Sequence, residues 1–422
     1  MGRQYFGTDG VRGVVGELLT ADLVERLGRA ATLWSGARRV FVGRDTRGSG
    51  LELEGALTDG IVSAGADAVL GGVLPSGAVA IRALDFDLGV VITASHNPPE
   101  YNGVKLFRRD GKLSDADEEA IEKLLDAPTG PVRGTVEHAA EAREAYVDYV
   151  TTTFGADLSG LDLVVDCANG ACSGLAASAF GRLGATVHSI GDSPDGTNIN
   201  EGCGATDTAL LQRTVVERGA ALGLAFDGDG DRLIAVDERG EVVDGDGILA
   251  ILALYLDEKL VVVTQMTNLG FHALMEERGI RVVTTDVGDR YVLEALVREG
   301  GVLGGEQSGH IIHLADHVTG DGLPAALLLC AALRGRRLSE AAAILQRFVQ
   351  CKKDVRVSTK QLTSAVEAAI DRANAELVGE GRVLVRPSGT EPIIRILVEA
   401  RDGALAEKAC DKISELVESE LG

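Results

Sequence analysis

Ser95 and His96 stand side by side in a polar loop, residues 93–98, that directly follows the apolar run of residues 88–92. A strand that ends in a turn presents the side chains of the turn on a rigid edge, as an activated nucleophile requires. Ser95 is therefore the predicted nucleophile, and His96 is the first candidate for a catalytic base. Neighbouring side chains on extended backbone point apart, so an ordinary turn is the alternative for this pair alone.

A second loop alternates aspartate with glycine and contains Asp227, Asp229 and Asp231. This alternation lets three carboxylates converge on one hard cation, so the loop predicts a site for Mg²⁺ or another divalent ion that prefers oxygen. The spacing also resembles an EF-hand, but Arg232 occupies the position that requires glycine, and residues 233–236 are typical of a strand. A solvated acidic turn would leave three like charges without a counter-ion.

A third loop, residues 304–310, places Glu306, Ser308 and His310 among glycines that allow a ligand to approach closely. Glu306 can accept hydrogen bonds from sugar hydroxyls, and His310 can move protons near neutral pH. An ordinary surface histidine is the alternative. The loop is therefore predicted to read a polyhydroxylated ligand.

A fourth loop lies between two strand-like runs and is rich in phosphate-binding groups. Its hydroxyls, backbone N–H groups and guanidinium groups form a predicted phosphate cradle made of Arg386, Ser388, Gly389, Thr390 and Arg395. A hairpin turn rich in turn-forming residues is the alternative.

Arg12 and Lys105 are two further cations with open roles. Arg12 lies in the glycine-rich run of residues 5–13, and Lys105 follows Ser95 by ten positions. Either side chain can reach a phosphoryl group or simply face solvent, so neither position decides the function alone.

Composition limits the class of protein. The chain has 422 residues, of which 45% are apolar and 25% charged, as expected for a soluble globular protein of two to four domains. The net charge of −23 argues against nucleic acid and anionic membranes as partners. No apolar run is long enough to span a bilayer, the N-terminal residues lack a signal-peptide core, and the six cysteines form no Cys-x-x-Cys pair. We therefore expect a cytoplasmic protein with free thiols.

Apolar strand-like runs alternate with amphipathic helical stretches, which favours α/β layers. A helix is expected over residues 141–154, and the break after it begins a second unit. The last part of the chain has the pattern of a small α+β domain with two helices. The predicted domains are residues 1–154 with the nucleophile, 155–245 with the aspartates, 246–352 with the sugar loop, and 353–422 with the phosphate cradle.

The four loops, in this order, resemble those of the α-D-phosphohexomutase superfamily over nearly the whole chain. The resemblance implies three similar α/β domains with mixed sheets, followed by a smaller α+β C-terminal domain, around a central cleft. Residues 5–13, residues 287–292 and Gln307 are most similar to the members that act on glucosamine phosphates. Asp286 departs from the small or basic residue found in many relatives.

The resemblance also implies a reaction. Ser95 would carry a phosphoryl group, and Mg²⁺ would be held by the three aspartates and a phosphoryl oxygen on Ser95. Glucosamine 6-phosphate would accept the phosphoryl group, turn over as the hexosamine 1,6-bisphosphate intermediate, and leave as glucosamine 1-phosphate for UDP-N-acetylglucosamine and cell-wall precursor synthesis. The phosphate cradle would hold the other phosphate, Glu306 and Ser308 would bind sugar hydroxyls, and Lys105 or His310 would be the general acid and base.

Three alternatives remain open on the sequence. A phosphomutase for glucose or mannose phosphates would share the phosphoryl-transfer machinery, and a sugar-phosphate sensor would share the fold without the chemistry. A nucleotide-dependent kinase is disfavoured because no Gly-x-x-x-x-Gly-Lys-Ser/Thr loop is present. The expected partner is a phosphosugar substrate, and the chain is expected to be a monomer or homodimer.

Overall fold

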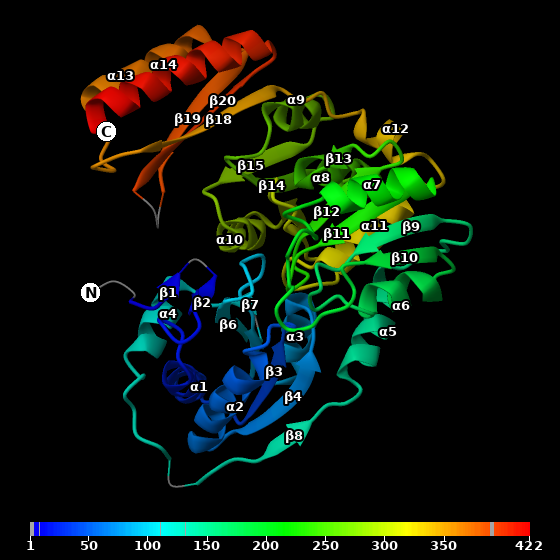
Figure 1. Cartoon of the computed structure of the whole chain (residues 1–422), viewed down its shortest axis with the longest axis vertical. Helices are drawn as coiled ribbons and strands as arrows, with labels where there is room; N and C mark the ends of the chain where they lie inside the picture. The colour runs from blue at the N-terminus through cyan, green and yellow to red at the C-terminus, as the bar shows by residue number, and fades with distance from the viewer. Residues whose placement is uncertain (1–3, 8, 110, 131, 389–391) are drawn as a thin grey trace. The chain divides into compact units, whose positions relative to one another are not determined.

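The computed structural model describes residues 4–7, 9–109, 111–130, 132–388 and 392–422. The chain divides into two compact units (Figure 1). The first combines Met1–Met266 with Ile280–Ala343, and the second combines Thr267–Gly279 with Ile344–Gly422. Within the described residues, no helix is long and apolar enough to cross a membrane.

The first unit begins with a mixed sheet of eight strands in the order β1-β2-β6-β5-β3-β4-β8, with β7 paired to β6. Strands β3, β4, β5 and β8 run parallel, whereas β6 and β2 are antiparallel to their neighbours. The strands are β1 Phe6–Gly7, β2 Gly10–Val14, β3 Arg39–Arg44, β4 Asp67–Val73, β5 Leu88–Ile92, β6 Tyr101–Arg108, β7 Gly111–Lys112 and β8 Val136–His138. The helices are α1 Ala21–Ser35, α2 Gly50–Ser63, α3 Ser76–Arg82, α4 Asp115–Glu122 and α5 Ala142–Phe154, with a 3₁₀ turn at Ala83–Asp85.

Burial explains why the central strand β5 is continuously apolar. All five of its residues are buried, as expected for a parallel strand that is covered on both faces. Helices α1 and α2 pack closely because glycine lies at their contact: a Cβ added at Gly60 would lie 2.0 Å from the carbonyl oxygen of Glu25. Helix α1 begins at the N-cap Thr20 and ends at Gly36, which has left-handed backbone conformation.

Two smaller mixed sheets follow in the first unit. One has the order β10-β9-β11-β12-β13 and the other β15-β14-β16-β17. Their strands are β9 Asp162–Asp166, β10 Thr186–Ile190, β11 Leu222–Phe226, β12 Leu233–Asp237, β13 Val242–Val243, β14 Leu260–Thr264, β15 Arg281–Thr285, β16 Leu303–Gly305 and β17 Ile311–His313. The accompanying helices are α6 Leu175–Arg182, α7 Ala209–Arg218, α8 Gly245–Tyr255, α10 Asp289–Glu299, α11 Gly322–Leu333 and α12 Leu338–Ala342.

The three sheets of the first unit share one type of connection between strands. In each, a strand that is parallel to one neighbour turns through a polar loop into an antiparallel strand: β5 into β6, β11 into β12, and β16 into β17. These connecting loops are those predicted to carry the nucleophile, the aspartates and the sugar-reading residues. The prediction of three similar α/β domains with mixed sheets and a smaller C-terminal domain is confirmed.

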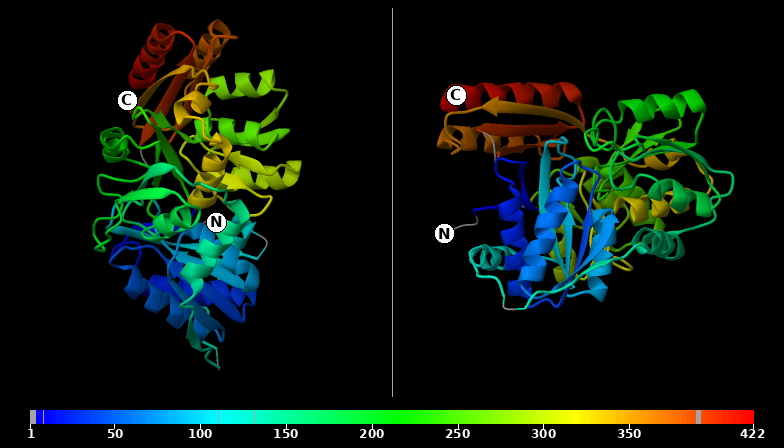
Figure 2. Two further views of the ribbon diagram at one scale, coloured as in Figure 1. Left: turned by 90° about the vertical axis from the view of Figure 1, so that its right-hand side faces the viewer. Right: turned by 60° about the horizontal axis from the view of Figure 1, so that its bottom comes forward.

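The second unit contains an antiparallel sheet in the order β18-β20-β19, formed by Val349–Arg356, Ile393–Ala400 and Gly381–Pro387 respectively. Helices α13 (Ser364–Glu376) and α14 (Gly403–Leu421) contribute to one apolar core with these strands. The left view of Figure 2 shows the two helices, orange and red, next to each other.

Helix α9 (Leu269–Glu277) also belongs to the second unit, although it lies far earlier in the sequence. The side chain of Asn268 pairs with the backbone of Phe348 on both sides, accepting from its N–H at 2.9 Å and donating to its carbonyl at 3.0 Å. Arg382 donates to the carbonyl of Thr267 at 2.6 Å. These bonds join α9 to the chain that leads into β18 and to β19.

His272 on α9 makes the stability of the protein depend on pH. Burial, assisted by the nearby Arg382, lowers the pKa of His272 from 6.5 to about 4. The unfolded chain therefore binds more protons between these values, so stability falls as the pH drops from about 6.5 towards 4. After allowance for solvent screening, His272→Gln is expected to reduce the loss of unfolding free energy between pH 7 and pH 5 by about 1 kcal/mol.

Urea unfolding of the full chain at both pH values measures this difference. His138→Gln, which changes an exposed histidine of β8, is the matched control and should behave as the wild type. An unchanged pH dependence in His272→Gln would refute the assignment.

Candidate functional site

Ser95 lies at the carboxyl end of β5 and is 1% exposed. Its Oγ donates to Oδ2 of Asp227 at 2.5 Å and lies 3.3 Å from Nδ1 of His96. Burial, with the positive charges of Arg232 and Arg12, lowers the pKa of His96 to about 4. His96 is therefore neutral near pH 7 and able to accept a proton. The structure thus brings the predicted nucleophile to the aspartate loop of a different sheet.

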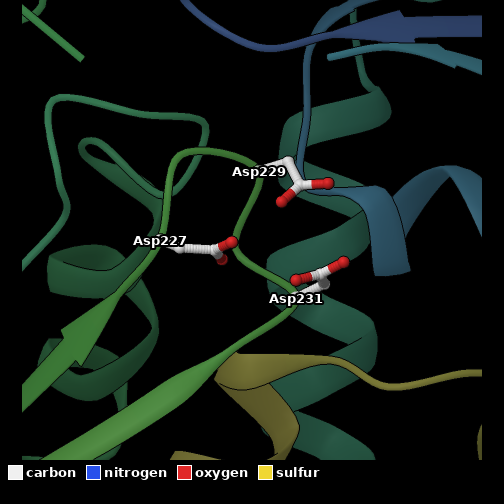
Figure 3. A group of neighbouring side chains, drawn as sticks. All are labelled: Asp227, Asp229 and Asp231. Atoms are coloured by element: carbon white, nitrogen blue, oxygen red, sulfur yellow. The ribbon is translucent and has the colours of Figure 1, made fainter. Parts of the chain in front are cut away.

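The three aspartates form a compact, buried group in the loop between β11 and β12. Their ligand oxygens lie within 4.8 Å of one another, and the side chains turn towards a shared space (Figure 3). Burial and repulsion from Asp231 and Asp229 raise the pKa of Asp227 to about 8. Strand β12 follows directly, so the loop is not an EF-hand.

The free oxygens of the aspartates test whether a metal ion fits. Among the described residues, Oδ1 of Asp229 and Oδ1 of Asp231 are buried without a hydrogen-bond partner. Orphaned carboxylate oxygens of this kind are costly unless a cation neutralises them. An oxygen-only donor set suits a hard divalent ion. The group can therefore bind a metal.

Lys105 on β6 closes the other side of the aspartate group. Its Nζ lies 2.7 Å from Asp229, 3.0 Å from Asp231 and 2.8 Å from Asp9. Burial disfavours the ammonium ion, but these three carboxylates outweigh burial and raise the pKa of Lys105 well above its usual value. In this arrangement Lys105 is a hydrogen-bond donor and a fixed positive charge.

His310 reaches the same group from the third sheet. Its Nδ1 lies 3.8 Å from Asp231, and its Nε2 lies 3.3 Å from Asp289. Burial opposes protonation, yet Asp289 and Asp231 raise the pKa of His310. A backbone bridge between Arg232 and His310 connects the second and third loops directly.

These contacts form a closed circuit of alternating charge, which we call the charge ring. Lys112 completes it by pairing with Asp289 and, at 3.2 Å, with Asp9. In order, the ring consists of Lys105, Asp231, His310, Asp289, Lys112 and Asp9. The ring therefore links Lys105 and His310, the two predicted proton-transfer groups, through salt bridges alone.

Three members of the charge ring were not predicted as site residues: Asp9, Lys112 and Asp289. Asp9 and Asp289 lie within runs noted for their resemblance, residues 5–13 and 287–292, which was the available signal. Lys112 carried none, because a lone lysine after a turn is typical of a surface. Arg12 pairs with Asp9, so this predicted site residue contacts the charge ring.

The predicted sugar-reading loop turns between β16 and β17. Oε1 of Glu306 accepts the N–H of Gly288 at 3.1 Å, and burial raises the pKa of Glu306. Ser308 is exposed. The positive charges of Arg232 and His310 act on Glu306 and oppose the rise of its pKa. This loop therefore lies beside the aspartate group.

In the second unit, Arg386 and Arg395 face each other as cross-strand partners on β19 and β20. Burial and the charge of Arg395 lower the pKa of Arg386. Directly opposed like charges repel, and Asp354, the cross-strand partner of Arg395 on β18, offsets part of this repulsion. Ser388 is buried, and its carbonyl accepts from Lys360 at 2.8 Å; the predicted partners Gly389 and Thr390 lie outside the described residues.

Four domain families match successive parts of this chain. They are described as phosphoglucomutase/phosphomannomutase alpha/beta/alpha domain I at residues 3–130, domain II at 144–240, domain III at 244–351 and the C-terminal domain at 353–416. The chain belongs to the phosphoglucomutase/phosphomannomutase family.

Within that family, the chain is similar to phosphoglucosamine mutases. It is 51% identical to that of Moorella thermoacetica, over 94% of this chain and 96% of the relative. It is 45% identical to that of Bacillus subtilis, over 99% of each chain.

Solved structures share the fold. A phosphoglucomutase/phosphomannomutase family protein from Burkholderia thailandensis is 26% identical with a TM-score of 0.85, covering 98% of this chain and 97% of that one. An Aspergillus fumigatus N-acetylphosphoglucosamine mutase, solved with GlcNAc-6P and magnesium, is 19% identical with a TM-score of 0.73, covering 99% and 96%.

The aspartate group predicts opposite effects on metal binding and on metal-free stability. Asp227→Asn removes a buried carboxyl whose ionised form is disfavoured by burial and by Asp231 and Asp229, so the metal-free protein should melt about 2 °C higher. The same change removes a ligand and should weaken Mg²⁺ binding by about 100-fold. Calorimetric titration with Mg²⁺ and thermal melting after chelation measure the two effects.

Asp237→Asn is the matched control. Asp237 is also a buried aspartate, but its Oδ1 accepts the backbone N–H groups of Arg239 and Glu241, at 2.9 Å each. This variant should lose stability and keep its affinity for Mg²⁺. Equal Mg²⁺ affinity in Asp227→Asn and wild type would show that the metal binds elsewhere.

Proposed function

We propose that the protein interconverts glucosamine 6-phosphate and glucosamine 1-phosphate, with Ser95 as the carrier of the phosphoryl group. The observation that carries the proposal is the hydrogen bond of 2.5 Å between Ser95 and Asp227, in a buried aspartate group that fits a cation. The similarity to phosphoglucosamine mutases along nearly the whole chain supports the choice of sugar.

In this proposal Asp227, Asp229 and Asp231 would hold Mg²⁺ together with a phosphoryl oxygen on Ser95. When bound, the ion offsets the negative charge of the transferring phosphoryl group. Magnesium accompanies the sugar phosphate in the Aspergillus fumigatus mutase, which shares this fold. The other contribution to catalysis is the positioning of the reacting groups by the side chains around the loops.

The first transfer moves the phosphoryl group from Oγ of Ser95 to O1 of glucosamine 6-phosphate. The bond from phosphorus to Oγ breaks, the bond to O1 forms, and the hydroxyl proton of O1 passes to the enzyme as Oγ regains a proton. The second transfer breaks the bond from phosphorus to O6 of the bisphosphate and forms the bond to Oγ, while O6 gains a proton from the enzyme and Oγ loses its own. There the neutral His96 and Asp227 are the groups within reach of the serine proton.

Lys105 and His310 are the two groups proposed to exchange a proton with the sugar hydroxyl. Each contacts Asp231, and the charge ring joins them, so a proton lost by one changes the field at the other. Arg12, paired with Asp9, is proposed to orient the transferring phosphoryl group.

We assign the sugar hydroxyls to Glu306 and Ser308, and the phosphate that does not react to the cradle of Arg386, Ser388, Gly389, Thr390 and Arg395. The proposed domain limits remain residues 1–154, 155–245, 246–352 and 353–422. The proposed partner is the phosphosugar, with the protein acting as a monomer or homodimer.

The choice of sugar is tested by comparing kcat/KM for glucosamine 6-phosphate, glucose 6-phosphate and mannose 6-phosphate. Glucosamine 6-phosphate is expected to be preferred by at least tenfold, which corresponds to about 1.4 kcal/mol in the transition state. Ser95→Ala, which lacks the carrier oxygen, is the inactive control. A preference for either hexose phosphate would favour the glucose or mannose mutase, and full turnover by Ser95→Ala would refute the serine carrier.

The phosphate cradle is tested by Arg386→Gln. Loss of a charge-assisted hydrogen bond to phosphate costs about 1.5–3 kcal/mol, so kcat/KM should fall about 10- to 100-fold. Relief of the repulsion from Arg395 should leave the melting temperature of the free protein unchanged or raised. Arg372→Gln, an exposed arginine of α13, is the control with wild-type kinetics, and wild-type kinetics for Arg386→Gln would contradict the assignment.

A further inference from the structure

The backbone of Ser95 adopts a conformation that serine rarely takes. Its φ angle is +52°, in the left-handed region. A non-glycine residue in this region costs about 1–2 kcal/mol and persists only where the surroundings impose it. The loop must therefore contain contacts that hold Ser95 in place.

The side chain of Arg47 supplies most of these contacts. It is completely buried, and all five of its N–H groups are used. Nη2 donates to the carbonyls of Ser95 at 2.9 Å and Asn97 at 2.8 Å. Nη1 donates to the carbonyl of Tyr101 at 2.9 Å and to that of Pro98. One guanidinium group thus binds three carbonyls of the nucleophile loop, residues 93–98, and the carbonyl of Tyr101 at the start of β6.

Asp45 and Thr93 hold the other side of the serine. Nε of Arg47 donates to Oδ2 of Asp45 at 2.9 Å, and the hydroxyl of Thr93 donates to the same oxygen at 2.7 Å. The backbone N–H of Ser95 then donates to Oγ1 of Thr93 at 2.9 Å. Both the N–H and the carbonyl of Ser95 are therefore fixed by one circuit that begins at Asp45.

Asn200, from the segment after β10, repeats part of this arrangement. Its Nδ2 donates to the carbonyl of Ser95 at 2.9 Å and to that of Asn97 at 3.1 Å. Two carbonyls therefore accept from both Arg47 and Asn200. Arg47 follows β3 of the first sheet, and Asn200 follows β10 of the second sheet. Segments from two sheets therefore bind the same loop.

We propose that Arg47 is a positioning residue for phosphoryl transfer, which acts by holding Ser95 in the left-handed conformation that directs Oγ at Asp227. It touches neither substrate nor reacting atoms. This inference rests on the proposed function. An error of about 1 Å in the placement of a reacting group costs about 100-fold in rate, so the serine must return to one position each time it loses or gains its phosphoryl group.

The planar guanidinium explains why arginine is required. Its donors lie in a fixed fork that reaches carbonyls on two sides while Nε faces a carboxylate. The single ammonium group of lysine cannot span the same set. Arg47→Lys therefore keeps the charge next to Asp45 but loses most of the loop contacts, which separates geometry from charge.

The test follows phosphorylation of Ser95 by glucose 1,6-bisphosphate, using intact mass, together with steady-state kinetics of the full chain. In Arg47→Lys we expect the phosphorylation rate and kcat to fall about 100-fold, and KM for the sugar phosphate to stay within about threefold. Methylguanidinium is expected to restore part of the rate to Arg47→Ala. Thr93→Val, which deletes only the hydroxyl that binds the Ser95 N–H, should lose rate in the same way.

Arg44→Lys is the matched control. Arg44 lies at the end of β3, pairs with Glu54 at 3.0 Å and donates to the backbone carbonyl of Asp45 at 3.3 Å. The circuit uses the side chain of Asp45 instead, which Arg44 leaves to Arg47 and Thr93. It should keep the wild-type rate. A purely structural role for Arg47 predicts instead that any lost activity follows the lost folded fraction, as judged by melting temperature.

Three outcomes would overturn the inference: a wild-type phosphorylation rate in Arg47→Lys, an equal loss in Arg44→Lys, or a rise in KM without a fall in kcat. Hydrogen exchange of residues 93–101 separates this inference from the proposed function. Faster exchange in Arg47→Lys than in wild type and Arg44→Lys supports the positioning role even if wild type converts no glucosamine 6-phosphate, and unchanged exchange refutes it.

Discussion

Three carboxylates buried within 4.8 Å of one another impose the main constraint on this protein. Like charges in a low-dielectric interior are unstable unless opposite charges surround them. Lys105 meets two of the aspartates, and Arg232 lies 3.9 Å from the third. The charge ring extends this compensation outward, so Lys105 and His310, which we propose for proton transfer, also stabilise the aspartate loop. Stability and catalysis therefore draw on the same side chains.

The way in which the loops meet has a simple structural origin. Each of the three sheets in the first unit reverses direction at one point, where a parallel strand turns into an antiparallel one. The loop at that point leaves the carboxyl end of the parallel strand, where ligand-binding residues of α/β sheets collect. The same type of connection occurs three times and forms the loops to which we assign the proposed nucleophile, the proposed metal ligands and the proposed sugar contacts.

The loops themselves could be predicted because each interrupts an apolar strand with residue types of narrow chemical use. Strand β6 could not, since Asn102 and Lys105 break its apolar pattern and are buried only because partners distant in sequence meet them. Arg47 was missed for the same reason: its acceptors are backbone carbonyls, which have no signature in the sequence. Lys112 could be recognised as a member of the charge ring only from its pairing with Asp289, which is distant in sequence.

The second unit is discontinuous in sequence, since α9 belongs to it while the chain on either side of α9 does not. Exchanging the C-terminal part between two relatives at one junction near residue 352 would therefore cut through a packed body. The new sheet would meet an α9 segment selected for a different partner, at contacts such as the hydrogen bond of 2.6 Å from Arg382 to the carbonyl of Thr267. Residues 267–279 and the C-terminal part are thus expected to have evolved together, as two separated segments of one inherited module.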